Sequence, residues 1–181
     1  ISFMDKKTIF INLFGGPCTG KSTLCALIFA NLKKEGIDCE MALEYVKDLV
    51  WEESFKKIEN QLYIFGKQHN RLFRLNKKVD VVITDSPLLN SIVYYNGDNP
   101  IFEDCVMFEF KKLNSINYYL NRTFDYIDSG RMQNIEEANS VDIKYKNLLD
   151  RNNIEYEIIN FNDSNISNIT NDIILKMNND K

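Results

Sequence analysis

Apolar residues along the chain follow two spacings that predict two kinds of element. Short runs rich in β-branched and aromatic residues predict buried strands, which we expect at residues 8–14, 39–43, 79–84, 116–120 and 156–161. Between these runs, apolar residues recur every three or four positions, which predicts helices at residues 20–34, 54–77, 100–113, 135–150 and 165–177. Shorter helical segments are expected at residues 44–51 and after Pro87.

Each predicted strand is followed by helical sequence. Parallel strands need crossover connections, so this alternation predicts an α/β fold with a parallel sheet covered by helices on both faces. The length of 181 residues fits one domain, and we expect a single domain over residues 1–181. Ile1-Ser2-Phe3 precede Met4, so we expect residues 1–3 to be a remnant ahead of a natural start at Met4.

The first predicted strand and helix are joined by Gly15-Gly-Pro-Cys-Thr-Gly-Lys-Ser22, which satisfies G-x-x-x-x-G-K-[ST]. The glycines allow a tight turn that aims backbone N–H groups at phosphate oxygens, and the helix dipole adds positive potential. We expect Lys21 to place its cation between the β- and γ-phosphates and the Ser22 hydroxyl to coordinate Mg²⁺. The residues expected to contact ATP are Gly15, Gly16, Pro17, Cys18, Thr19, Gly20, Lys21, Ser22 and Thr23.

Two carboxylates follow predicted strands. Asp85 closes the third strand, and ligands of parallel sheets collect at the carboxyl ends of the strands. It is therefore expected to hold Mg²⁺ or to accept a proton from the acceptor. The alternative is that Asp85 or Ser86 caps the next helix, and a capping role can coexist with a role in the site. Glu44 ends the second strand, where it is expected to bind a sugar hydroxyl or act as a general base; a solvated side chain is the alternative.

Two arginines bracket the polar segment after the fourth strand. We expect residues 121–134 to form a lid in which Arg122 and Arg131 neutralise charge on the transferred phosphoryl group. The alternative is a pair of solvated surface arginines.

The acceptor pocket is expected to involve four further residues. Trp51 is the single tryptophan and is positioned to stack on a base, or else to serve as a core or rim aromatic. Gln61, Gln68 and Arg71 share one face of the long predicted helix. They either line the acceptor pocket or form the polar face of an amphipathic helix.

Composition narrows the chemistry. The 22 Lys and Arg against 26 Asp and Glu give a net charge of −4, which argues against a protein that coats duplex DNA or an anionic membrane. One histidine excludes a His-rich zinc site and the two-His metalloprotease motif. The four cysteines contain no C-x-x-C pair and are expected to be reduced thiols in a cytoplasmic protein, in a host cytoplasm if phage-encoded.

The order of phosphate-loop motif, Glu44, strand ending in Asp85-Ser86-Pro87 and arginine-bearing segment resembles the P-loop kinases of small molecules. Residues 44–51 and 61–68 are most similar to the small phage-type AAA-domain ATPase/kinase group, related to nicotinamide riboside kinases and nucleoside and deoxynucleotide kinases. Deoxynucleoside kinases typically carry Glu-Arg-Ser after strand three, where this chain has no arginine.

This resemblance implies a five-stranded parallel sheet in the order 2-3-1-4-5. It also implies ATP on residues 15–23, Mg²⁺ on Ser22 and Asp85, Glu44 at the acceptor, and Arg122 and Arg131 in the lid.

The expected function is ATP-dependent, Mg²⁺-assisted phosphoryl transfer to a small acceptor: a nucleoside, a nucleotide or a related metabolite. One alternative is a kinase acting on polynucleotide ends or modified bases in DNA, for which basic residues within 56–78 supply a local patch. Another is a P-loop ATPase or switch acting on a protein partner. The identity of the acceptor, the choice between ATP and GTP, and the oligomeric state stay open, and a homodimer is compatible with the fold.

Overall fold

The computed structural model describes residues 7–123, 135–160, 162 and 165–179. Its strands form one parallel sheet in the order β2-β3-β1-β4-β5, as the resemblance implied. The strands are β1 (Ile9–Phe14), β2 (Cys39–Met41), β3 (Val81–Thr84), β4 (Asn114–Leu120) and β5 (Glu157–Ile159).

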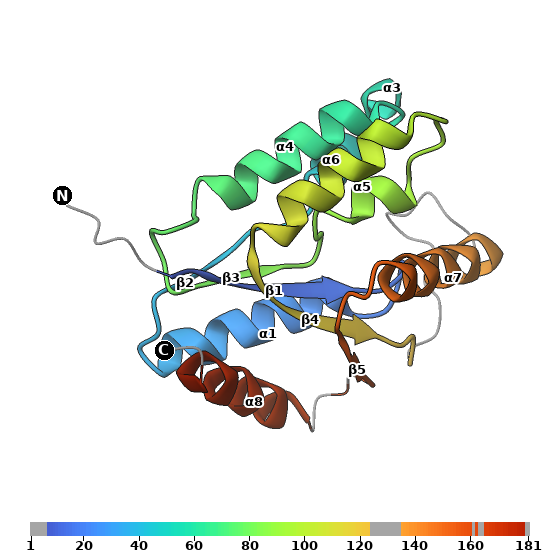
Figure 1. Cartoon of the computed structure of the whole chain (residues 1–181). Coiled ribbons are helices and arrows are strands. Elements are labelled where there is room, and N and C mark those ends of the chain that lie inside the picture. The colour runs from blue at the N-terminus through green and yellow to red at the C-terminus, as the bar shows by residue number, and fades with distance from the viewer. Residues whose placement is uncertain (1–6, 124–134, 161, 163–164, 180–181) are drawn as a thin grey trace.

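Helices cover both faces of this sheet. In Figure 1, α1 and α8 lie on one face, and α4, α5, α6 and α7 lie on the other. The helices are α1 (Lys21–Lys34), α2 (Tyr45–Trp51), α3 (Phe55–Ile58), α4 (Gln61–Phe73), α5 (Asn90–Val93), α6 (Pro100–Lys111), α7 (Ile135–Arg151) and α8 (Ile166–Asn179). In the described part of the chain, no helix combines the length and the hydrophobicity needed to cross a membrane.

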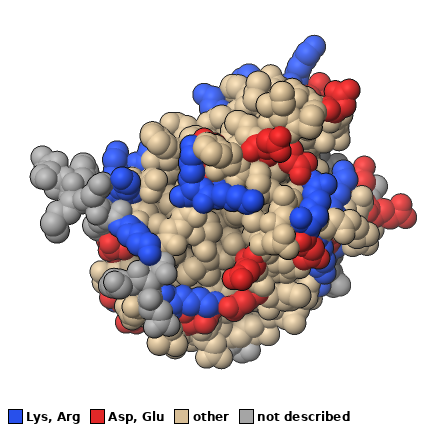
Figure 2. Space-filling model, viewed as in Figure 1, with Lys and Arg blue, Asp and Glu red and all other residues tan. Residues whose placement is uncertain are grey.

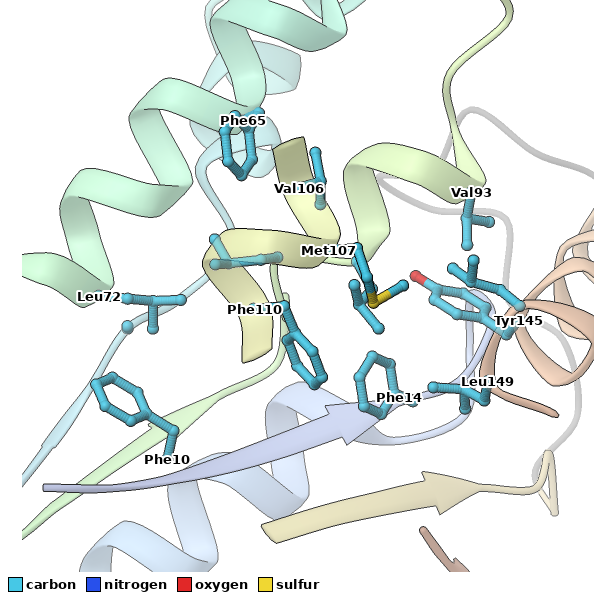
Figure 3. Packing of buried hydrophobic residues seen from close by; sticks show 14 of the residues in the cluster. Phe10, Phe14, Phe65, Leu72, Val93, Val106, Met107, Phe110, Tyr145 and Leu149 are labelled. Carbon is cyan, nitrogen blue, oxygen red and sulfur yellow. The ribbon is translucent and has the colours of Figure 1, made fainter. Parts of the chain in front are cut away.

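The central strand β1 joins two hydrophobic cores. Its six residues are all buried, and successive side chains point to opposite faces of the sheet. Phe14 packs edge-on against Phe110 and Tyr145, with ring centroids 6.2 Å away in each case (Figure 3). On the other face, Ile11 joins a core that α1 and α8 complete. Packing on both faces fixes β1, and therefore fixes the loop that follows it.

The prediction of one long helix at residues 54–77 is wrong, because the chain forms two helices there, α3 and α4. Asn60 has φ −87° and ψ 86°, and its side chain accepts a hydrogen bond from the Tyr63 N–H at 3.1 Å. An asparagine that caps a new helix ends the preceding one, although the apolar spacing continues through it. The second helix also stops early, at Phe73, and Lys77 has φ 64°.

The helix expected directly after Pro87 also begins later. The Pro87 carbonyl accepts a hydrogen bond from the Asn90 N–H at 3.0 Å, which closes a turn before α5. Smaller differences concern strand ends: β4 starts at Asn114, and β5 is limited to three residues.

Candidate active site

The loop between β1 and α1 needs glycine at two positions. Gly15 and Gly20 have φ values of 140° and 88°, which L side chains rarely adopt. A Cβ atom on Gly15 would also lie 2.8 Å from the Leu120 carbonyl oxygen. Gly20 stands immediately before α1, so the loop delivers its backbone to the positive end of that helix.

Lys21 is folded into this loop. Its Nζ donates hydrogen bonds to the carbonyl oxygens of Gly15 and Gly16, each at 2.7 Å. Burial lowers the pKa of the Lys21 ammonium, while the nearby carboxylates of Glu44 and Asp85 act in the opposite direction. The cation therefore stands at the loop, where phosphate oxygens can replace carbonyl oxygens as its partners.

Asp85 connects three segments of the site. One carboxylate oxygen accepts a hydrogen bond from the Ser22 hydroxyl at 2.6 Å, and the other accepts from the Glu44 backbone N–H at 2.9 Å. The end of β3 is thereby tied to the start of α1 and the start of α2.

The Ser22 hydroxyl and the Asp85 carboxylate are hard oxygen donors of the kind that Mg²⁺ prefers. Mg²⁺ is usually held by one or two protein groups together with phosphate oxygens and waters. Within the described residues, no group of three or more His, Cys, Asp or Glu could hold a metal ion. The donor set therefore fits a nucleotide-bound Mg²⁺ and not a protein-only metal cage.

Glu44 stands at the junction of β2 and α2. It occupies the N-cap position of α2, but its side chain makes no capping hydrogen bond. It lines the same cavity as Lys21 and Asp85. Burial, followed by the negative charge of Asp85, raises the pKa of the Glu44 carboxyl.

A cavity of about 490 Å³ extends from the phosphate loop into the space between α2, α4 and α5. Its lining outside the loop combines apolar and aromatic side chains with a few polar ones: Glu44, Val46, Lys47, Val50, Trp51, Ile58, Gln61, Ile64, Gln68, Asp85, Ser86, Pro87, Asn90, Ser91, Tyr94 and Tyr145. This is the composition typical of small-molecule sites.

Among the residues that the structure describes, two amides in this cavity each have one atom without a hydrogen-bond partner. Gln68 Oε1 accepts from the Tyr45 N–H at 3.1 Å, while the buried Gln68 Nε2 has no partner. Asn90 Nδ2 donates to the Ser86 hydroxyl at 3.0 Å, while Asn90 Oδ1 has no partner. Buried polar atoms are normally paired, so these two point to a ligand.

The other residues expected at the acceptor lie in different surroundings. Trp51 lines the cavity but is 71% exposed, so it forms part of the rim. Gln61 is buried in the lining, and its amide donates to the Ile58 carbonyl at 3.0 Å. Arg71 is not among the lining residues; it donates to the Leu43 carbonyl at 2.9 Å and pairs with Asp48.

Arg122 contacts the phosphate loop directly. Its Nε donates to the Pro17 carbonyl at 3.1 Å, and its guanidinium pairs with Asp142 at 2.8 Å. Asp142 also accepts a hydrogen bond from the Gly16 N–H at 2.8 Å. Arg131 lies outside the described residues.

Sequence reasoning did not identify Asp142 or Asn90. Asp142 lies on an ordinary amphipathic helix between Val141 and Tyr145, and no motif marks it. Asn90 opens a short helix just beyond Pro87. The sequence predicts the helix that carries Asp142. Only the packing of that helix against the phosphate loop shows that Asp142 faces the loop.

A sequence family described as AAA domain matches residues 10–165 of the chain. This chain belongs to that AAA-domain family. Solved structures with a similar fold include a NadR protein in complex with NR, at a TM-score of 0.67 and 16% identity. A thymidylate kinase from Ehrlichia chaffeensis matches with a TM-score of 0.63 and 14% identity. Comparison with curated proteins finds no match.

The extent of these matches differs. The alignment with the NadR–NR complex covers 87% of this chain and 47% of NadR, so the AAA-domain chain spans about half the length of that protein. The alignment with the thymidylate kinase covers 94% of this chain and 98% of the kinase. A second NadR structure, with NAD and AMP-PNP, has a TM-score of 0.63 at 14% identity and covers 86% and 45% of the two chains. At such identities the likeness establishes the shared fold, and the family expected from the sequence is confirmed.

Proposed function

We propose that this AAA-domain protein transfers the γ-phosphoryl group of ATP to a small acceptor of the nucleoside or nucleotide class. The observation that carries the proposal is the continuity of one cavity, which joins the phosphate loop to a pocket with two unpaired buried amide atoms. A simple ATPase needs the first part of this cavity but not the second.

On the nucleotide side, the loop N–H groups and Lys21 bind the phosphates. Ser22 and Asp85 would hold Mg²⁺, which would supply charge neutralisation to the nucleotide phosphates. Arg122 supports the loop through the Pro17 carbonyl. Positioning and charge stabilisation by these groups account for most of the catalysis expected of a phosphoryl-transfer site.

On the acceptor side, Glu44 is the general base. Both Asp85 carboxylate oxygens already accept hydrogen bonds from Ser22 and from the Glu44 N–H, so Asp85 is committed elsewhere. The raised pKa of Glu44 makes its carboxylate a stronger base. The acceptor oxygen forms a bond to the γ-phosphorus, its proton passes to Glu44, the bond from the β–γ bridging oxygen breaks, and ADP leaves.

The unpaired amides support a flat, polar acceptor ring. Gln68 Nε2 offers a donor and Asn90 Oδ1 offers an acceptor, which match a ring edge that carries both kinds of group. The solved relatives support the same class, since one is a thymidylate kinase and another is a NadR protein in complex with NR. The cavity of about 490 Å³ lies within the range usual for such ligands.

The test is a coupled assay of ADP release and of phosphorylated product over nucleosides, nucleotides, NR and short oligonucleotides. We expect Lys21→Ala and Asp85→Asn each to lower transfer by at least about a hundredfold. Lys34→Ala, at the far end of α1, is the matched control and should leave transfer unchanged. Full activity in Lys21→Ala, or slow hydrolysis that ignores every acceptor, would contradict the proposal.

Gln68→Leu tests the acceptor pocket separately. Removing the unpaired donor should raise KM for the acceptor about tenfold or more while KM for ATP stays constant. Asn70→Leu, on the exposed side of the same helix, is the control. Equal effects on both KM values would place Gln68 outside the acceptor pocket.

A further inference from the structure

Arg71, in the last turn of α4, contacts three residues that flank Glu44 in the sequence. Its guanidinium donates to the Leu43 carbonyl at 2.9 Å and pairs with the Asp48 carboxylate. The guanidinium carbon also lies 5.2 Å from the centre of the Tyr45 ring. We call residues 43–48 the Glu44 segment. One side chain thus holds this segment on both sides of Glu44.

The Glu44 segment has two further contacts with α4. The Tyr45 N–H donates to Gln68 Oε1 at 3.1 Å, and the Tyr45 hydroxyl lies 2.7 Å from the Tyr63 hydroxyl. The rings of these two tyrosines also meet edge-on, with centroids 5.9 Å apart. The Glu44 N–H itself donates to the Asp85 carboxylate at 2.9 Å. The backbone that carries Glu44 is therefore fixed both by the end of β3 and by α4.

The Glu44 side chain depends on this backbone for its direction. It lines the cavity, yet it makes no capping hydrogen bond at the start of α2 that would fix its carboxylate. The neighbouring charges that shift its pKa belong to Asp85, Lys21 and Lys47. Within the described residues, the contacts of Arg71 are with the Glu44 segment and not with the Glu44 carboxylate. Arg71 can therefore act on that carboxylate only through the segment that carries it.

We propose that Arg71 is a positioning residue that holds the Glu44 carboxylate toward the cavity through the Glu44 segment. This inference rests on the function proposed above, in which Glu44 is the general base. A guanidinium suits the task because its planar fork donates in two directions while its face lies on an aromatic ring. A lysine ammonium carries the same charge but has neither the fork nor the plane.

An ordinary surface ion pair is the simpler explanation of the contact between Arg71 and Asp48. Figure 2 shows basic and acidic side chains interspersed over one face of the molecule, and pairs of exposed charges contribute little by themselves. The Asp48 side chain is 53% exposed, but that of Arg71 is only 26% exposed. The difference arises because Arg71 also contacts a backbone carbonyl and a ring. Three partners in one segment fix the guanidinium in a single orientation.

The titration of Glu44 tests this proposal without relying on activity. Carboxyl signals of ¹³C-glutamate in the full-length chain report protonation by NMR, and Glu44→Gln identifies the Glu44 signal. Burial raises the pKa of Glu44, and a loosened segment admits water, so Arg71→Leu should lower this pKa toward that of an exposed glutamate. Arg74→Leu, at the exposed end of the same helix, is the matched control and should leave the pKa unchanged. An unshifted Glu44 titration in Arg71→Leu overturns the proposal.

Arg71→Lys separates geometry from charge in the phosphoryl-transfer assay. Both Arg71→Leu and Arg71→Lys should lower kcat roughly tenfold to a hundredfold, because a misplaced base slows the chemical step, while KM for ATP stays constant. Full kcat in Arg71→Lys would show that the charge alone suffices, and a lowered Tm with unchanged kcat would show a purely structural role; either result overturns the proposal. If wild type transfers no phosphoryl group, the general-base role of Glu44 is contradicted, and the NMR titration still decides whether Arg71 positions Glu44.

Asp48→Asn provides a milder variant that keeps the size of the side chain. It should lower the pKa of Glu44 and kcat in the same direction as Arg71→Leu but by less, because Arg71 retains the Leu43 carbonyl and the Tyr45 ring. Added to Arg71→Leu, it should cause no further change, since the two side chains act through one contact. Losses that add in the double variant would show that Asp48 and Arg71 act independently, which overturns the proposed positioning through the Glu44 segment.

Discussion

Asp142 and Arg122 both hydrogen-bond to the backbone at the start of the phosphate loop, Asp142 to an N–H group and Arg122 to a carbonyl oxygen. Asp142 accepts from the Gly16 N–H at 2.8 Å, and Arg122 donates to the Pro17 carbonyl at 3.1 Å. The two side chains also pair with each other, and both are largely buried. A carboxylate beside an anion-binding loop is unfavourable for a phosphate unless its charge is neutralised, which is what Arg122 does here.

We predict that Asp142→Asn tightens nucleotide binding roughly tenfold, equal to about 1.4 kcal/mol, because the Arg122 cation beside the loop is then no longer neutralised by a carboxylate. Titration with a fluorescent ATP analogue measures this affinity. Asp150→Asn on the same helix is the control, since the Asp150 carboxylate accepts an exposed hydrogen bond from the Tyr156 hydroxyl, away from the loop. Equal affinities in the wild type and Asp142→Asn would show that the pair has no role in nucleotide binding.

The contrast between Asp85 and Asp142 shows what could be predicted from the sequence at this scale. Asp85 follows a buried strand directly, and the carboxyl end of a parallel strand fixes the edge to which such a residue belongs. Asp142 meets Gly16 across 126 positions of sequence, through the packing angle of α7. No local pattern carries that angle, so neither this contact nor the one that Arg122 makes was predictable.

At the scale of elements, the break between α3 and α4 shapes the lining of the cavity. Separation of the two helices lets α4 begin at Gln61, with Gln61 and Gln68 both facing the cavity. Periodicity indicated correctly that these glutamines share a face. It could not indicate the break, because Asn60 acts through one side-chain hydrogen bond that leaves the apolar spacing unchanged.

Asn60→Ala should lower the free energy of unfolding by about 1 kcal/mol, because the Tyr63 N–H loses its capping acceptor. For a chain of this size, that corresponds to a fall in Tm of about 2–4 °C. Ser54→Ala is the matched control: Ser54 holds the same position before α3 but makes no capping hydrogen bond, so its change should stay within about 0.5 kcal/mol. Thermal denaturation followed by circular dichroism distinguishes the two. Equal shifts would mean that Asn60 does not stabilise α4 by capping.

At the scale of the whole molecule, the alternation of strands and helices was sufficient to predict a parallel sheet with helices on both faces. The phosphate loop then followed from one motif between β1 and α1. Glu44, Trp51, Gln61 and Gln68 were expected near the proposed acceptor pocket and line the cavity, but the rest of its lining did not follow, because α2, α4 and α5 contribute to it from separate parts of the sequence.

In the proposed reaction, Glu44 makes activity and stability depend on pH in opposite directions. Its pKa is raised in the folded protein, so between the unfolded and folded pKa values the native state holds a proton that the unfolded state has lost. The free energy of unfolding therefore falls as pH rises through this window, and the stability that Glu44 contributes is fully present only below its unfolded pKa. The proposed reaction uses Glu44 as its carboxylate base, so activity should rise over the same window.

Glu44→Gln removes this titration. We predict that the variant is nearly inactive, and that its stability relative to wild type increases as pH rises above about 4.5. Denaturant unfolding of both proteins from pH 4 to pH 8 measures the difference, with Glu40→Gln on the exposed side of β2 as the control. Parallel pH profiles for Glu44→Gln and wild type would show that Glu44 titrates as an ordinary surface carboxyl. Glu44 would then lack the raised pKa on which its assignment as the general base depends. The stability experiment therefore also tests that assignment.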